Sequence, residues 1–268
     1  MTTLLHISDT HFGTERPSVM EALVRFAQSE APDCILFTGD ITQRARRHQF
    51  AAARRFIGRL SAPVIAVPGN HDIPLFNLPA RLLNPFGNYR RYIGRSLEPQ
   101  FESPTLQILG VNTTRPSRHV DGAVSSRQIA RVSDQLRAAQ PGQLRVVIQH
   151  HPVRAIEQSD LHNLLIGHEA AVPAWVDAGM DLLLAGHIHL PYIRPLQGHS
   201  GRQALTVQAG TALSSRTRGE TGNSLNLIRY TPPREQQNVT RRCMVERWDF
   251  EADRDAFCLA DRQTQVFT

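Results

Sequence analysis

Short apolar runs that end in polar residues recur along the first two thirds of the chain. The first run, at residues 4–7, is followed by Asp9 and His11. An apolar run of this length, bounded by turn residues, is typical of a strand buried inside a sheet. Strands of this kind are predicted at residues 4–7, 34–38, 64–67, 105–111, 144–149 and 180–185.

The segments between these strands favour helices. Within residues 19–30, Met20, Leu23 and Ala27 recur at helical spacing and therefore lie on one helix face. Thr42 is a suitable N-cap for a second helix, and Ser125 or Ser126 for a third. Helices are predicted at residues 19–30, 43–60, from 125 or 126 to 139, and 168–178. This alternation of strands and helices predicts an α/β domain.

The pattern changes in two places. Residues 73–104 are rich in proline and aromatic residues, which predicts an irregular segment with a short helix inside it. Beyond residue 190, strands joined by turns are predicted at 192–196, 203–209, 224–230 and 244–250. We therefore predict a single domain over residues 1–268, with a motif-bearing core at about 4–190 and a β-rich part at about 191–268, added late as antiparallel strands.

Five of the predicted strands end in aspartate, asparagine or histidine. These endings are Asp9-x-His11, Gly39-Asp40, Gly69-Asn70-His71-Asp72, His150-His151-Pro152 and Gly186-His187-x-His189. Ligands of α/β sheets bind beyond the carboxyl ends of the strands, so the five endings are expected to converge. A set of imidazole, carboxylate and amide groups suits Zn, Fe or Mn and is too rich in nitrogen for Ca or Mg. The ligands are too many for one ion, whereas two ions bridged by one carboxylate fit the count.

Two neighbouring positions in these endings need separate interpretation. The strand before His150 ends at Gln149, which places His150 at the strand tip. Pro152 favours an extended conformation at His151, so His151 is expected behind the ligands or at the rim. Asp72 is expected to orient the local backbone rather than to bind metal. Glycines before three of the endings permit close backbone approach.

Composition and charge narrow the function classes. All 30 basic residues are arginines, and the net charge is +6. The absence of lysine excludes a P-loop lysine, a protein-kinase lysine and a Schiff base on lysine. The arginines of segment 43–60 are interpreted as a solvated face, and a nucleic-acid patch remains the alternative, although no aromatic row accompanies them.

The cysteines and the apolar segments indicate the cellular location of the protein. Cys34, Cys243 and Cys258 form no C-x-x-C pair, which predicts neither a disulfide framework nor a cysteine zinc site. The amino-terminal segment lacks a basic region, and no apolar stretch of about 18 residues occurs. The sequence therefore predicts a cytoplasmic protein with no membrane span.

The five endings, in this order, resemble those of the calcineurin-like metallophosphoesterase superfamily. In size and motif style the chain is similar to bacterial class III cyclic nucleotide phosphodiesterases and their glycerophosphodiesterase relatives. The resemblance implies a four-layer α/β/β/α sandwich with a dinuclear metal site. It assigns Asp9, His11 and His189 to the first metal, Asp40 to both metals, and Asn70, His150 and His187 to the second. It places His71 beside the site, in contact with substrate or leaving group rather than with metal.

The resemblance implies a phosphodiesterase that hydrolyses cyclic nucleotides or related small phosphodiesters. Two divalent ions, Fe or Mn with Zn or Co as alternatives, would hold a bridging hydroxide that attacks phosphorus in line. Asp40 would fix the metal spacing, and His71 would donate to the leaving oxygen or stabilise charge. Asn70, His71 and Arg115 are the candidate substrate contacts, although a solvated loop is the alternative for Arg115 and its neighbours. A nuclease or a phospholipid or nucleotide-sugar hydrolase on the same core, and a non-catalytic scaffold, remain the alternative functions.

Overall fold

The computed structural model describes residues 1–233 and 241–267. Residues 234–240 and 268 belong to the predicted β-rich part and lie outside the described residues. The strands of one sheet are β1 Thr2–Ile7, β2 Cys34–Phe37, β3 Val64–Ala66, β10 Ser224–Thr231, β11 Arg241–Glu251 and β12 Ala256–Phe267. Those of the other sheet are β4 Gln100–Ser103, β5 Leu106–Gly110, β6 Leu144–Ile148, β7 Leu182–Ala185, β8 Tyr192–Gln197 and β9 Gln203–Gln208. The helices are α1 Pro17–Glu30, α2 Arg47–Ile57, α3 Leu78–Leu83, α4 Gly87–Tyr92, α5 Ser126–Arg137 and α6 His168–Asp177.

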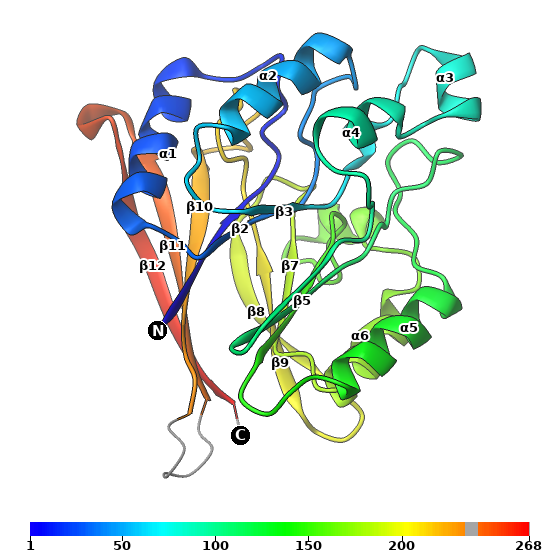
Figure 1. The fold of residues 1–268 in the computed structure, drawn as a ribbon, viewed down its shortest axis with the longest axis vertical. Coiled ribbons are helices and arrows are strands. Elements are labelled where there is room, and N and C mark those ends of the chain that lie inside the picture. Colours follow the sequence, from blue (N-terminus) through cyan, green and yellow to red (C-terminus); the bar gives the residue numbers. More distant parts are fainter. Residues whose placement is uncertain (234–240, 268) are drawn as a thin grey trace.

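The two sheets pack face to face, and helices cover their outer faces (Figure 1). Leu36 of the first sheet and Val146 of the second belong to one fully buried apolar cluster between the sheets. Leu23 of α1 and Phe50 of α2 pack on the outside of the first sheet. Trp175 of α6 packs with α5 on the outside of the second. The central strands of each sheet are buried on both faces, by the other sheet and by helices, so the predicted four-layer α/β/β/α sandwich is confirmed.

Strand direction determines where the polar endings meet. The first sheet has the order β12-β11-β10-β1-β2-β3, and the second has the order β4-β5-β6-β7-β9-β8. Strands β1, β2 and β3 run parallel, as do β5, β6, β7 and β9. The carboxyl ends of parallel strands share one edge of a sheet, so the endings of β1, β2 and β3 gather at the first sheet and those of β6 and β7 at the second. These two edges face each other, since ligand atoms of Asp9 and Asp40 lie within 4.8 Å of one on His150.

The carboxyl-terminal strands extend both sheets and differ from the expectation at two strands. Strands β10 to β12 add to the first sheet in antiparallel pairs, as predicted. Strand β9 instead pairs in parallel with β7, because β8 occupies the sheet edge and β9 lies between them. Strand β12 follows a tight turn after β11 and was not predicted.

The predicted helix 43–60 is shorter than expected at both ends, since α2 covers Arg47–Ile57. The carboxylate of Asp72 accepts hydrogen bonds from the backbone N–H groups of Ile41 and Thr42 at 3.1 and 2.9 Å. Ala45 has a φ of 52°, which ends any helical path before α2 begins. Thr42 therefore caps a turn through Ala45 rather than the helix.

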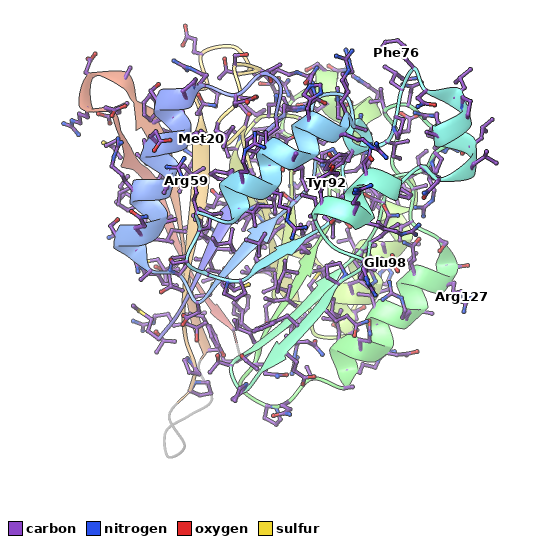
Figure 2. The ribbon with its side chains drawn as sticks, turned by 45° about the horizontal axis from the view of Figure 1, so that its top comes forward. Met20, Arg59, Phe76, Tyr92, Glu98 and Arg127 are labelled. Atoms are coloured by element: carbon purple, nitrogen blue, oxygen red, sulfur yellow. The ribbon has the colours of Figure 1, made fainter. Side chains whose placement is uncertain are left out.

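The irregular segment 73–104 contains two short helices, α3 and α4, and the edge strand β4. Phe76 lies at the periphery, on the connection that leads into α3 (Figure 2). The side chain of Tyr89 on α4 is buried and donates to the carbonyl of Ala66, which fixes this segment to the end of β3. Within residues 1–233 and 241–267, no helix has the length and apolar character needed to cross a membrane.

Candidate metal centre

The polar endings of β1, β2 and β3 meet those of β6 and β7 where the carboxyl edges of the two sheets adjoin, as predicted. Their side chains form four groups in which the potential ligand atoms lie within 4.8 Å of one another. These groups are Asp9–His11–His189, Asp9–Asp40–His150, His11–Asp40–His71 and His150–His151–His187. Because the groups share members, they make one continuous cluster rather than separate sites.

The first part of the cluster centres on Asp9. Its Oδ1 lies 3.2 Å from Nε2 of His189 and 3.8 Å from Nε2 of His11. The two histidine Nε2 atoms are 3.1 Å apart. Three ligand atoms from β1 and β7 thus face a common point.

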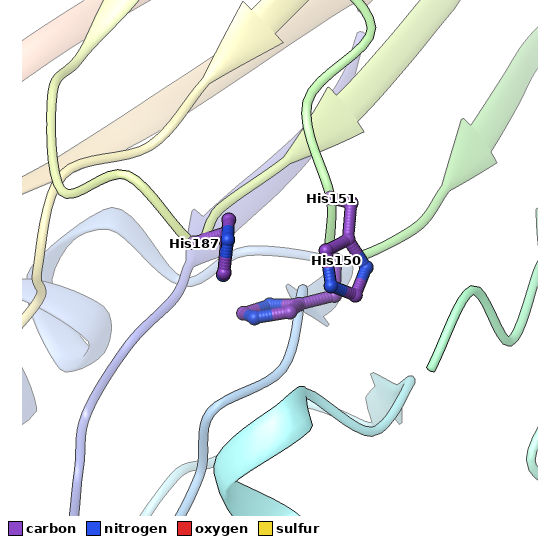
Figure 3. A group of neighbouring side chains, drawn as sticks. All are labelled: His150, His151 and His187. Atoms are coloured by element: carbon purple, nitrogen blue, oxygen red, sulfur yellow. The ribbon is translucent and has the colours of Figure 1, made fainter. Parts of the chain in front are cut away.

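Asp40 lies between this group and a second one. Its Oδ2 is 3.7 Å from Nε2 of His11, and its Oδ1 is 3.4 Å from Nε2 of His150. His150 in turn lies 3.1 Å from Oδ1 of Asn70. The ring of His187 lies beside that of His150, with centroids 5.0 Å apart (Figure 3). One carboxylate therefore presents an oxygen to each half of the cluster.

Hydrogen bonds to the far ring nitrogens orient the imidazoles. Nδ1 of His150 donates to the carbonyl of Thr38 at 2.8 Å, so in the neutral imidazole the Nε2 lone pair faces Asp40. Nδ1 of His189 donates in the same way to the carbonyl of Arg216. In His151, Nε2 donates to the carbonyl of Val120 at 2.8 Å. Its Nδ1 accepts from the hydroxyl of Thr113 at 2.7 Å, so His151 has no free lone pair although it lies next to His150.

Burial and charge set the protonation of the cluster without metal. Burial alone would raise the pKa of Asp9, but His189 and His150 outweigh it and lower that pKa to about 2. Burial would also raise the pKa of Asp40, and His150 and His71 hold it well below the usual value. Burial disfavours a charged His150, yet Asp40 raises its pKa to about 9. The two buried carboxylates thus stay ionised and depend on positive charge close by.

Backbone strain coincides with the cluster. Five residues of the cluster have positive φ angles, which are 52° at Asp9, 42° at His11, 47° at Asp40, 80° at His187 and 56° at His189. They are five of the eight non-glycine residues with positive φ in the described parts of the chain. Such conformations cost of order 1–3 kcal/mol each and persist where the surroundings enforce them, often at functional sites.

The donor set fits divalent metal ions. Oδ1 of Asp9 is buried and has no hydrogen-bond partner among the described residues. A buried, ionised oxygen without a donor is costly unless a cation approaches it. The surrounding imidazole nitrogens and carboxylate oxygens are ligands that Zn, Fe and Mn accept.

Close backbone approach explains the glycine before Asn70. A Cβ added to Gly69 would lie 2.1 Å from both the backbone nitrogen and Oδ1 of Asp40. Gly69→Ala is therefore expected to displace Asp40, to destabilise the fold by about 1–3 kcal/mol and to weaken metal binding. Gly94→Ala is the matched control, because an added Cβ there meets nothing within 4 Å. Urea unfolding and elemental analysis of both variants test this, and an unchanged Gly69→Ala variant would contradict it.

Two polar side chains near the cluster were not anticipated from the sequence. Arg216 lies with Nη1 3.3 Å from Nε2 of His71 and 3.0 Å from Oε1 of Gln43. Arg216 follows β9, whose parallel pairing was not predicted, so its loop was not recognised as a further strand ending. The signal available was the Ala-Gly-Thr turn directly after that strand.

Arg115, predicted as a substrate contact, lies elsewhere. Its guanidinium donates to the carbonyls of Asn112 and Thr114 and to Oε1 of Gln128. It lines a separate cavity together with Glu98. This placement does not favour contact between Arg115 and a substrate at the metal centre.

An α/β/β/α sandwich with aspartate, asparagine and histidine gathered at its strand ends is the architecture of metallophosphoesterases. A sequence model of the calcineurin-like phosphoesterase family matches residues 2–191, and the chain belongs to this family. The fold is also that of a dimetal phosphatase from Danio rerio, with a TM-score of 0.67 at 16% identity over 100% of this chain and 99% of that one.

Curated relatives are similar over parts of their length. A probable glycerophosphodiester phosphodiesterase GpdQ of Arcobacter nitrofigilis is 27% identical, over 59% of this chain and 57% of the relative. A probable cyclic nucleotide phosphodiesterase of Rhodococcus erythropolis is 26% identical, over 69% of this chain and 64% of the relative. The matches thus span less than two thirds of these two relatives.

Proposed function

We propose that this chain is a dinuclear metal-dependent phosphodiesterase that hydrolyses cyclic nucleotides or related small phosphodiesters. The observation that carries the proposal is the position of Asp40, with one carboxylate oxygen 3.7 Å from His11 and the other 3.4 Å from His150. A carboxylate that faces two sets of ligands suits a bridge between two metal ions. The names of the curated relatives support a diester substrate.

The residues divide between two metal ions as follows. One ion would be held by Asp9, His11, His189 and Asp40, and the other by Asp40, Asn70, His150 and His187. The occupied nitrogens of His151 favour His150 as the ligand. Iron and manganese suit this mixed nitrogen and oxygen set, with Zn or Co as alternatives. When bound, such ions lower the pKa of a water and neutralise charge on phosphoryl oxygens.

His71 is proposed to assist the leaving group. Its backbone N–H donates to Oδ1 of Asp40 at 2.8 Å, which holds the residue against the centre. Its ring Nδ1 donates to the carbonyl of Gln43 at 2.9 Å, so Nε2 is the nitrogen that can exchange a proton with substrate.

Two cavities meet at His71 and support a substrate with two substituents. The larger, of about 600 Å³, opens over Asp40, His187 and His189. The smaller, of about 180 Å³, is lined by Gln43, Arg44, Ile73, Leu75, Arg81 and His119. Both cavities share Asn70, His71 and Val120, so a phosphorus atom at the centre could direct one ester group into each.

A cytoplasmic location is proposed from the cysteines. Cys34, Cys243 and Cys258 are all free, and the first two are buried. Three unpaired thiols suit a reducing compartment.

Side-by-side assays of four substrates with manganese test the proposed function. We expect faster hydrolysis of bis(p-nitrophenyl) phosphate than of p-nitrophenyl phosphate, and measurable turnover of 3′,5′-cyclic AMP. The Asp40→Ala variant serves as the blank for contaminating phosphatases. A preference for the monoester would contradict the diester assignment, and preferential cleavage of single-stranded DNA would favour a nuclease.

A further inference from the structure

We propose that Arg216 is a phosphate-binding residue that contacts the phosphoryl oxygens of the substrate. The inference rests on the proposed function and adds a contact that neither the strand-end motifs nor the comparisons assign. It starts from the position of the side chain. Arg216 lines the larger cavity together with Asp40, His71 and His189. Its guanidinium therefore lies where a phosphoryl group over the centre would be bound.

The contacts of Arg216 are all with neutral groups or imidazoles. Nη1 donates to Oε1 of Gln43 at 3.0 Å and lies 3.3 Å from both Nε2 of His71 and Nδ1 of His11. In the part of the chain that the structure describes, no carboxylate lies within ion-pair distance of its guanidinium. A partly buried guanidinium without an acidic partner carries a positive charge that no carboxylate compensates, so it can pair with an anionic ligand.

Arg218, two residues further on, shows the contrast. Its guanidinium pairs with Asp160 at 2.8 Å and with Glu157 at 2.5 Å. Arg218 lines the same cavity, but two carboxylates neutralise it. The loop therefore carries two arginines with different surroundings. Arg218 is paired with carboxylates, whereas the guanidinium of Arg216 faces the candidate metal centre without one.

Metal binding would release the contact between Arg216 and His11. Nε2 of His11 faces Asp9 and Asp40, and it is the nitrogen that would bind metal. A neutral imidazole that uses its Nε2 lone pair keeps its hydrogen on Nδ1. Nδ1 of His11 then cannot accept from Arg216. The N–H group of Arg216 becomes available to a phosphoryl oxygen in the metal-loaded protein.

The loop holds Arg216 in place before any ligand binds. Its carbonyl accepts from Nδ1 of His189, and its backbone nitrogen donates to Oγ of Ser214 at 3.2 Å. Ser214 contacts Thr211, whose hydroxyl donates to the carbonyl of Asp9 at 2.6 Å. The loop after β9 is thereby tied to both metal-binding strands. A donor fixed in advance stabilises developing phosphoryl charge without reorganisation.

Binding of inorganic phosphate to the manganese-loaded protein tests the inference directly. Isothermal titration calorimetry and competitive inhibition of bis(p-nitrophenyl) phosphate hydrolysis both report it. Arg216→Gln is expected to weaken phosphate binding by about 10–100-fold, the scale of a lost hydrogen bond to a charged group. Arg216→Lys should recover part of the loss. Arg137→Gln, the matched control, should change phosphate affinity by less than about threefold, since Arg137 is exposed on α5 and does not line this cavity.

Elemental analysis accompanies each titration, and Arg216→Gln should retain both metal ions. Loss of metal in this variant, unchanged phosphate affinity, or equal weakening in Arg137→Gln would each overturn the inference. Failure of the inference differs from failure of the proposed function. If phosphate binds through Arg216 but the protein cleaves no diester, the phosphate-binding role of Arg216 stands and the proposed phosphodiesterase function fails. If the protein hydrolyses diesters but its phosphate affinity does not depend on Arg216, the proposed function stands and the role of Arg216 fails.

Discussion

Asp40→Ala is expected to lose at least one of two metal ions and nearly all hydrolytic activity. The physical reason is that Asp40 offers one carboxylate oxygen to each half of the cluster, Oδ2 to His11 and Oδ1 to His150. Its removal takes one ligand from both ions at once and leaves buried histidines without their anionic partner. Elemental analysis after manganese loading and initial rates with bis(p-nitrophenyl) phosphate measure the two effects.

The control for this variant is Asp134→Ala. Asp134 lies on α5 and pairs with Arg137 at the surface, where both side chains are more than half exposed. Exposed pairs of this kind contribute about 0–1 kcal/mol, so this variant should keep both ions and its activity. An Asp40→Ala protein that retains two ions and wild-type rates would contradict the bridging role.

His71→Ala is expected to keep both metal ions and to lose about 10²–10⁴-fold in turnover, the usual scale for general-acid or electrostatic assistance. Metal is retained because the contact of His71 with Asp40 runs through the backbone N–H, which the substitution leaves in place. Turnover is expected to fall because His71 lines the cavity over the centre and its Nε2 is the ring nitrogen proposed to face substrate. Steady-state kinetics and elemental analysis on the same preparation separate these effects.

His199→Ala is the control, since His199 is exposed in the turn after β8 and belongs to none of the five polar strand endings. It should match the wild type in both measurements. If His71→Ala loses a metal ion instead, His71 is a ligand, which the group His11–Asp40–His71 would also permit.

The strand endings were predictable from the sequence because buried parallel strands are marked by short apolar runs. The side chains that follow such runs gather at the carboxyl edge of their own sheet, and the packing of the two sheets brings both edges together. The sequence also favoured His150 over His151 as a ligand, since Pro152 restricts the backbone of the residue before it. The structure adds the hydrogen bonds that occupy both nitrogens of His151.

Long-range pairing could not be predicted in the same way. Strand β9 enters between β7 and β8, and no local pattern distinguishes this from an antiparallel hairpin. Arg216 was missed for that reason, because its place at the centre depends on the parallel pairing of β9 with β7. The start of α2 was misplaced because Asp72, about 30 residues away, holds the backbone of Ile41 and Thr42. Propensity within a segment carries no information about such a contact.

The most direct test of the account is anomalous diffraction from a crystal of the manganese-loaded protein. The account predicts two anomalous peaks per chain, about 3.5–4 Å apart, with Asp40 between them. One peak should be bounded by Asp9, His11 and His189, and the other by Asn70, His150 and His187. A single peak in an active, fully loaded crystal would contradict the proposed dinuclear centre. A second ion bound by His151 in place of His150 would contradict the proposed ligand set.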